Sequence, residues 1–213
     1  MNFVAIKKVF YDRRYEQREL TTLGEIKENN LCENIIEVKD KYFRFERDTG
    51  ECGKGKKSSG SKSTSEKKEY LHIVTDFLPY TINDLKILPQ TVQCEKAKFF
   101  CLESIRQVME GVFKGLRDLH SLGITHRDIK LCNILIDNNQ YPIKTVKICD
   151  FGSSKKLQSD PENQATVSIC YIGTRSFRAP ELLVGNQYYD SKIDVWSAGV
   201  IFLKLIFKYL NKK

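Results

Sequence analysis

The chain has 213 residues, 41% of them hydrophobic and 11% aromatic, with a formal net charge of +8 and a pI near 9.0. This apolar content supports a packed core and argues against disorder, and the length suits one large domain or two small lobes. The positive charge is spread along the chain, so the charge alone does not decide whether nucleic acid binds. We expect no nucleic-acid partner.

The cysteines also limit the class of protein. Their number is seven, which is odd, and none is paired as C-x-x-C. This pattern argues against a disulfide framework and against a zinc site, and it predicts a reducing compartment, cytoplasmic and/or nuclear. Met1 leads straight into a strand-like run, so we expect no signal peptide. The apolar stretch 195–210 contains Lys204 and Lys208 and is too short to span a bilayer, so we expect no membrane partner.

The first part of the chain predicts a small sheet with one helix. Residues 3–7 alternate like a strand, and residues 12–28 carry sparse apolar positions at helical spacing. Short strands are expected at 35–38 and 42–45. Residues 46–69 are rich in Lys, Ser and Gly without periodicity, which predicts a loop. A strand at 70–78 then leads to Pro79, which we interpret as a hinge between two lobes.

The second part predicts helices. Apolar residues recur with helical spacing in a strongly amphipathic segment, which Gly123 is placed to end; they are Ile105, Val108, Met109, Val112, Phe113, Leu116 and Leu119. Residues 193–210 are apolar nearly all round, as in a helix at the centre of a lobe. The sequence therefore predicts an α+β, two-lobed fold with a partial small lobe at 1–78 and a partial helical lobe at 79–213.

Residues 50–57 nearly match a phosphate-binding G-x-x-x-x-G-K-[ST] loop. Lys57 stands where the Mg²⁺-binding hydroxyl is needed, and no helical pattern follows to offer its N-terminus to phosphate. The same stretch nearly matches G-x-G-x-x-G but ends in Ser58. We interpret this segment as a solvated linker.

Three motifs in order carry the chemistry: HRDIKLCN at 126–133, DFG at 150–152 and APE at 179–181. Together they are the signature of a protein kinase catalytic lobe. Phosphoryl transfer needs a carboxylate to orient the attacking hydroxyl, for which Asp128 is placed, and a cation at the γ-phosphate, for which Lys130 is placed. It also needs oxygen ligands for Mg²⁺, for which Asn133 and Asp150 are the candidates. The expected cofactors are ATP and Mg²⁺, and the expected partners are protein substrates.

Five further segments refine this assignment: VAIKKV at 4–9, REL at 18–20, CDFGSSK at 149–155, RAPEL at 178–182 and IDVWSAG at 193–199. With them the chain resembles the glycogen synthase kinase 3 (Shaggy) family of the CMGC group, over nearly everything except residues 46–69 and the last few residues. Mitogen-activated kinases fit less well, because their Thr-x-Tyr pair is absent.

The resemblance implies a nucleotide site. It assigns Lys7 to the α- and β-phosphates and Glu19 to the ion pair that holds Lys7; taken alone, the two would be a surface pair worth about 0–1 kcal/mol. It gives Thr75 the gatekeeper position and lines the adenine site with Ala5, backbone groups of Asp76 and Leu78, and the side chains of Leu135 and Cys149. An ordinary buried cysteine is a compatible reading of Cys149.

The resemblance also implies the kind of substrate. Lys130 indicates Ser/Thr acceptors, and Thr174 would support this by bridging Asp128 and Lys130. Arg18, Arg127 and Lys155 match a pocket for a phosphate already present four residues C-terminal to the acceptor, and two Arg forks with a Lys suit a dianion. The alternative is that Arg127 only stabilises the activation segment and that Arg18 is a solvated helix residue.

Tyr171 matches the family's activation-loop tyrosine. Arg175 and Arg178 are then placed to receive its phosphate. A lone tyrosine packed against the lobe is the alternative.

Two departures from the family lead to two hypotheses. Only Met1, Asn2 and Phe3 precede the strand that follows the family's Gly-rich loop, and the chain stops just after the central helix, so we expect truncation at both ends. The apolar face of residues 195–210 would then be exposed. The first hypothesis is a Ser/Thr kinase acting on primed substrates. The second is a catalytically impaired, truncated kinase that serves as a non-catalytic binding module. Mg²⁺-dependent nucleotide binding separates them, and scaffold partners stay unknown.

Overall fold

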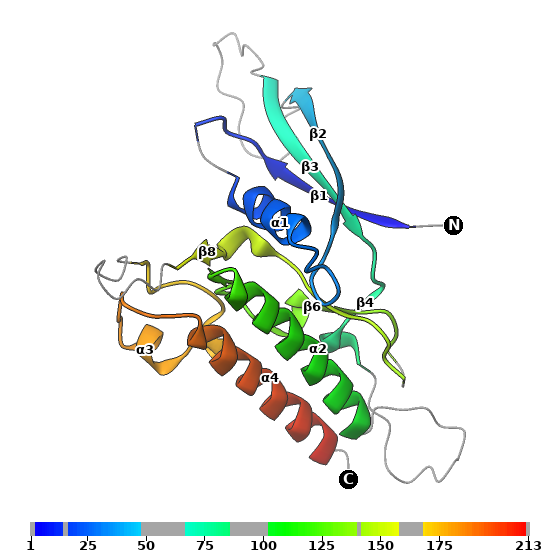
Figure 1. The fold of residues 1–213 in the computed structure, drawn as a ribbon, viewed down its shortest axis with the longest axis vertical. Coiled ribbons are helices and arrows are strands. Elements are labelled where there is room, and N and C mark those ends of the chain that lie inside the picture. Colours follow the sequence, from blue (N-terminus) through cyan, green and yellow to red (C-terminus); the bar gives the residue numbers. More distant parts are fainter. Residues whose placement is uncertain are drawn as a thin grey trace, which may run out of the picture.

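The computed structural model describes residues 3–14, 17–47, 67–85, 102–139, 142–157 and 168–211. The first part is a three-stranded antiparallel sheet in the order β1-β3-β2, with one helix lying on it (Figure 1). Its elements are β1 (Val4–Phe10), α1 (Arg18–Glu28), β2 (Val38–Arg47) and β3 (Lys67–Asp76).

The second part is mainly helical. Two long helices, α2 (Leu102–Ser121) and α4 (Lys192–Leu210), lie side by side in Figure 1, and the contacts between them are the most numerous that either helix makes. Two small sheets, in the orders β4-β6-β7 and β5-β8, lie at the junction with the first part. The remaining elements are β4 (Tyr80–Thr81), β5 (Ile124–Thr125), β6 (Ile134–Ile136), β7 (Val146–Ile148), β8 (Lys155–Lys156) and α3 (Pro180–Leu183). The expected α+β arrangement, sheet first and helices second, is confirmed.

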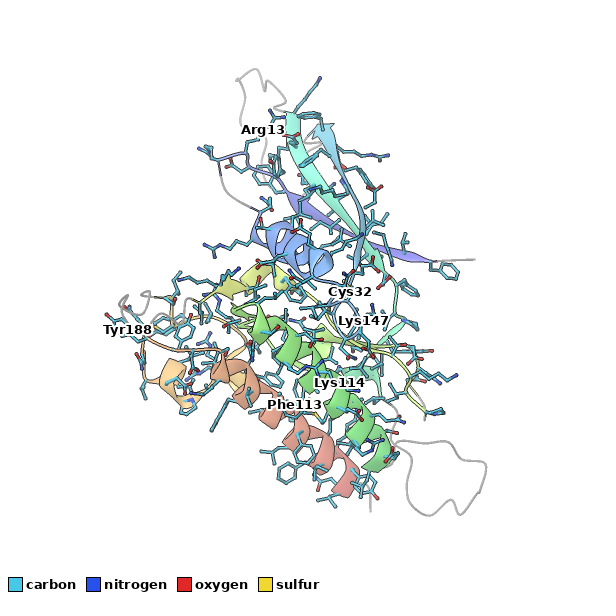
Figure 2. All side chains as sticks on the ribbon, in the orientation of Figure 1. Arg13, Cys32, Phe113, Lys114, Lys147 and Tyr188 are labelled. Atoms are coloured by element: carbon cyan, nitrogen blue, oxygen red, sulfur yellow. The ribbon has the colours of Figure 1, made fainter. Side chains whose placement is uncertain are left out.

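The predicted amphipathic helix is confirmed as α2, and most of its apolar positions are buried. Gly123, at φ +70°, follows its end, and the Gly123 N–H closes the last turn on the His120 carbonyl at 3.0 Å. Phe113 is the exception, because its side chain is 45% exposed at the edge of the stripe (labelled in Figure 2).

The helix predicted at 12–28 begins only at Arg18. Asp12 accepts the backbone N–H of Arg14 at 3.0 Å and also binds its guanidinium, so residues 12–14 form a turn instead. Competition of this kind from an Asp side chain is a common reason for a late helix start.

The strand predicted at 42–45 is confirmed within β2, but the strand predicted at 35–38 is wrong except for Val38, where β2 begins. The pairing of β2 with β3 is irregular between Val38 and Asp40. Ile35 forms only an isolated bridge to Ile148 and is fully buried. Its apolar side chain packs in the core of the large lobe rather than in the sheet.

Both ends of the predicted loop 46–69 are strand instead, and residues 48–66 lie outside the described residues. Residues 46–47 belong to β2 and residues 67–69 to β3, where Arg47 pairs with Lys67. The phosphate-loop near-match at 50–57 lies outside the described residues.

The helix predicted at 193–210 is confirmed as α4. One face, with Ile201 and Leu205, is buried, and the other exposes a row of apolar side chains as expected. These exposed residues are Val195, Trp196, Phe202, Leu203, Phe207 and Leu210. No helix within the described ranges is both long and apolar enough to cross a membrane.

Candidate active site

The HRD segment forms a loop between β5 and β6, at the junction of the two lobes. The loop turns sharply at Arg127, whose φ of +68° is rare for a residue with a side chain. Asp194, at the start of α4, stabilises this turn: its carboxylate accepts the backbone N–H groups of His126 and Arg127, both at 2.8 Å. Strained backbone that is held in this way is typical of functional sites.

Asp128 lies at the centre of a hydrogen-bonded cluster. Its Oδ2 accepts the ammonium of Lys130 at 2.6 Å, and its Oδ1 accepts both the hydroxyl and the backbone N–H of Thr174 at 3.0 Å. The hydrogen bond to Asp128 raises the pKa of Lys130, so the ammonium stays charged. Thr174 and Lys130 are thus joined through the Asp128 carboxylate, without a direct bond between them.

Lys7 joins three elements of the site. Its ammonium lies 2.8 Å from Glu19 on α1 and 2.7 Å from Asp150, which follows β7. Burial by itself would lower the pKa of Lys7, but the hydrogen bonds to Asp150 and Glu19 outweigh it and raise that pKa. The side chains of Glu19 and Lys7 are 13% and 44% exposed, so the pair is half-buried, and its contact with Asp150 makes it more than an isolated surface pair.

Asn133 and Asp150 offer oxygen atoms suited to Mg²⁺. The amide nitrogen of Asn133 donates to the Asp128 carbonyl at 2.9 Å, and its amide oxygen, which accepts only a weak bond from the Cys132 thiol at 3.8 Å, is the candidate ligand. Among the described residues there is no cluster of three or more His, Cys, Asp or Glu side chains able to hold a metal. The two oxygen donors of Asn133 and Asp150 fit Mg²⁺, which is usually bound by one or two carboxylates together with phosphates and water.

The proposed adenine site lies where β1 begins and where β3 and β7 end. Ala5 pairs with Thr75 across the sheet, and the chain then runs through Asp76 to Leu78. Leu78, Leu135 and Cys149 are half-buried and pack against the main core. Burial raises the pKa of the Cys149 thiol to about 12, so this group is protonated and serves as an apolar wall.

Arg18, Arg127 and Lys155 come together beside the catalytic loop. Arg127 donates to the Ser153 carbonyl at 2.6 Å and to the Tyr189 hydroxyl at 3.2 Å, and Lys155 donates to the Ser168 hydroxyl at 2.7 Å. Burial, followed by the charges of Arg127 and Arg18, lowers the pKa of Lys155. In the part of the chain that is described, none of the three cations forms an ion pair with a carboxylate, so together they form an uncompensated positive cluster.

The three candidate residues of the activation segment, Tyr171, Arg175 and Arg178, differ in exposure and in hydrogen bonding. The Tyr171 side chain is 79% exposed. Arg178 donates twice to the Gly173 carbonyl, at 2.9 and 3.1 Å, and so is occupied in holding the segment. Arg175 is exposed, in a short turn that ends at Phe177.

Two contributors were missed by the sequence reasoning. Asp194 is 1% exposed and also binds His120 at 3.0 Å. His126 is fully buried; it lies 3.0 Å from the Cys149 carbonyl and packs edge-on against Phe151, with the ring centres 4.9 Å apart. The sequence did contain a signal for Asp194, which is a lone carboxylate at the start of an apolar helix. A buried charge requires partners, so this position indicates hydrogen bonds to another segment.

The catalytic loop, the lysine–glutamate pair and the DFG aspartate thus lie together at the junction of the small sheet and the helical lobe. The protein kinase domain family matches residues 1–211, and the chain belongs to this family. A curated relative from Encephalitozoon cuniculi (strain GB-M1), named "Probable serine/threonine-protein kinase MRK1 homolog", is 38% identical over 200 residues. The match covers 94% of this chain and 51% of that relative, so the chain spans about half of the relative's length.

Proposed function

We propose that the chain is an ATP-dependent protein serine/threonine kinase that transfers the γ-phosphate of ATP to a Ser or Thr hydroxyl. The observation that carries this proposal is the ammonium of Lys7, which reaches both Glu19 and Asp150. This contact unites the small lobe, its helix and the DFG segment, which must all be in place for phosphoryl transfer.

Each site residue has its own role in phosphoryl transfer. Lys7 holds the α- and β-phosphates and is itself oriented by Glu19. Asp128 orients the substrate hydroxyl and accepts its proton, while Lys130 neutralises charge that develops on the transferred group. Asn133 and Asp150 would hold Mg²⁺, which supplies positive charge to the phosphate oxygens. Thr174 keeps Asp128 in place by donating to the oxygen that Lys130 does not bind.

A pair of neighbouring lysines tests this proposal. Lys7→Met should lower kcat at least about 100-fold, because it removes a charge contact that is made to the phosphates. Lys8→Met is the matched control, because Lys8 lies next in β1 and its ammonium binds Glu46 away from the cleft. Radiolabelled phosphate transfer to a Ser/Thr peptide library measures both. Equal activity of the two variants would contradict the assignment.

We further propose that the chain is of the glycogen synthase kinase 3 type and prefers substrates that are already phosphorylated. The support is the uncompensated cluster of Arg18, Arg127 and Lys155, since guanidinium forks and an ammonium suit a phosphate dianion. Arg18→Ala should then reduce transfer to a primed peptide far more than to its unprimed version. Equal losses on the two peptides would rule out the pocket while leaving the kinase proposal intact.

Three subsidiary assignments belong to the same proposal. The boundary between the lobes lies at residues 78 and 79, and the protein works in the cytoplasm and/or nucleus. Exposed Tyr171 is a modification site, with Arg175, four positions along the chain, to receive its phosphate. A phosphopeptide map of active protein that lacks this phosphate would contradict the assignment. The alternative, a non-catalytic binding module, predicts no Mg²⁺-dependent binding of ATP, so a nucleotide titration distinguishes it.

A further inference from the structure

Lys147, in the centre of β7, connects three separate segments. Its ammonium donates to the Asp76 carboxylate at 2.8 Å and to the Cys32 carbonyl at 2.9 Å. Asp76 ends β3, and Cys32 lies in the loop after α1. Figure 2 labels Lys147 next to Cys32, at the junction of the two lobes. The side chain of Lys147 therefore ties the large lobe to both parts of the small lobe that reach it.

The ion pair between Lys147 and Asp76 is more buried than the other ion pair that Asp76 forms. The side chains of Lys147 and Asp76 are 13% and 20% exposed. Asp76 also lies 3.0 Å from Lys39, but the Lys39 side chain is 43% exposed, and such exposed pairs are screened by water and contribute little. The pair of Lys147 with Asp76 is thus the stronger of the two connections.

The charge state of Asp76 agrees with this ranking. Burial by itself would raise the pKa of Asp76, but the hydrogen bonds from Lys147 and then Lys39 outweigh it and lower that pKa. The carboxylate is therefore ionised at neutral pH and needs its cationic partner, because a partly buried charge without one is costly.

The ion pair joins the two ends of the proposed nucleotide site. Backbone groups of Asp76 and Leu78 form its adenine end. At the other end, β7 leads from Lys147 through Ile148 and Cys149 to Asp150. A displacement of β3 relative to β7 would thus change the distance between the adenine contacts and the phosphate contacts.

A second set of bonds supports the same junction. The Ile148 N–H donates to the Asn34 carbonyl and the Ile36 N–H donates to the Ile148 carbonyl, both at 2.9 Å, and the Asp76 N–H donates to the Glu37 carbonyl at 3.2 Å. These backbone bonds hold the segment after α1 against β7. They also link the end of β3 to β7 indirectly, through residues 34–37, and the side chain of Lys147 adds a direct contact between β7 and Asp76.

We propose that Lys147 is a positioning residue for the nucleotide: by holding the Asp76 carboxylate and the Cys32 carbonyl, it fixes the hinge at the distance from Asp150 that ATP requires. This inference rests on the proposed kinase function. Lys147 touches no substrate atom in this scheme and acts through Asp76.

The test is a double-mutant cycle on the full chain, with ATP and Mg²⁺ as the probe. Lys147→Met and Asp76→Asn should each weaken ATP binding about tenfold in a calorimetric titration, because small displacements of binding groups are costly. If Lys147 acts through Asp76, the double variant should bind ATP about as weakly as either single variant. Lys147→Arg, which keeps the charge, should restore part of the affinity. Lys144→Met is the matched control, because Lys144 is exposed and precedes β7.

Kinetics distinguish positioning from general damage to the fold. The KM for ATP should rise in Lys147→Met, while kcat and the KM for the peptide stay near their wild-type values. A thermal melt without nucleotide checks that each variant is folded, and Asp76→Asn keeps the test available if Lys147→Met does not fold. Additive losses in the double variant, or wild-type affinity in both single variants, would overturn the inference alone. Failure of the wild-type chain to bind ATP would instead overturn the kinase proposal, and this inference with it.

Discussion

Asp194 accepts the backbone N–H of Arg127 at 2.8 Å across 67 positions of the chain. The carboxylate lies at the start of α4, and the peptide group lies where the catalytic loop turns through its φ of +68°. The first turn of α4 thus determines the path of the loop that carries Asp128. The loop that carries Asp128 is therefore held by a buried side chain of the large lobe, Asp194.

The first prediction concerns this carboxylate. Asp194→Ala should abolish phosphate transfer and lower the melting temperature, because two buried N–H groups lose their acceptor, at about 1–3 kcal/mol each. Asp190→Ala is the control, since Asp190 also accepts a backbone N–H, from Lys192 at 2.9 Å, but is exposed to water. Thermal melting and a transfer assay measure both variants. A similar loss in the two would contradict the role of Asp194.

The second prediction concerns two glycines in the left-handed region. A Cβ at Gly173 (φ +66°) would lie 2.5 Å from the Arg127 carbonyl oxygen, whereas one at Gly185 (φ +82°) would meet nothing within 4 Å. Both Ala variants carry the cost of the unfavourable φ, about 1 kcal/mol or more. Gly173→Ala should lose more stability than Gly185→Ala, and it should also lose activity because the catalytic loop must move. Denaturant unfolding compares them, and equal stabilities would contradict the close approach.

The third prediction concerns pH. The pKa of Asp76 is lowered from its ordinary value of 3.8, against the effect of burial, by Lys147 and then by Lys39. A lowered pKa in the folded state contributes stability that is present above the ordinary value and lost as the pH falls through the folded value. The stability difference between wild type and Asp76→Asn should therefore be constant from pH 5 to 7 and shrink below about pH 4. Urea unfolding across this range measures it, and a difference that grows on acidification would contradict the ion pair.

The fourth prediction concerns the exposed face of α4. Phe207 is 59% exposed and Leu205, on the opposite side, is 1% exposed. Phe207→Glu should reduce aggregation, seen by light scattering, and leave the melting temperature within about 2 °C, because surface changes are nearly neutral. Leu205→Glu should unfold the protein, since it places an unpaired charge in the core. If Phe207→Glu also unfolded the chain, that face would be buried rather than exposed.

Local patterns predicted much of the fold. Apolar residues with a period of 3.6 located α2, and alternating apolar residues located β1. Both patterns arise because one face of each element packs against a core. Element boundaries were less predictable. The side chain of Asp12 delays the start of α1, and Ile35 leaves the sheet to pack in the large lobe, and neither effect is encoded in local periodicity.

The sequence by itself determined the protein kinase domain family and the candidate site residues, because the order and spacing of HRD, DFG and APE and the identities of Lys7 and Glu19 need no coordinates. The tertiary structure alone decided which of these groups meet, because contacts such as Lys7 with Asp150, Asp194 with Arg127 and Lys147 with Asp76 join residues far apart along the chain. Contacts between residues so far apart in the chain produce no periodic pattern in the sequence. Their geometry and burial come from the packing of the two lobes, and burial determines how much each pair contributes.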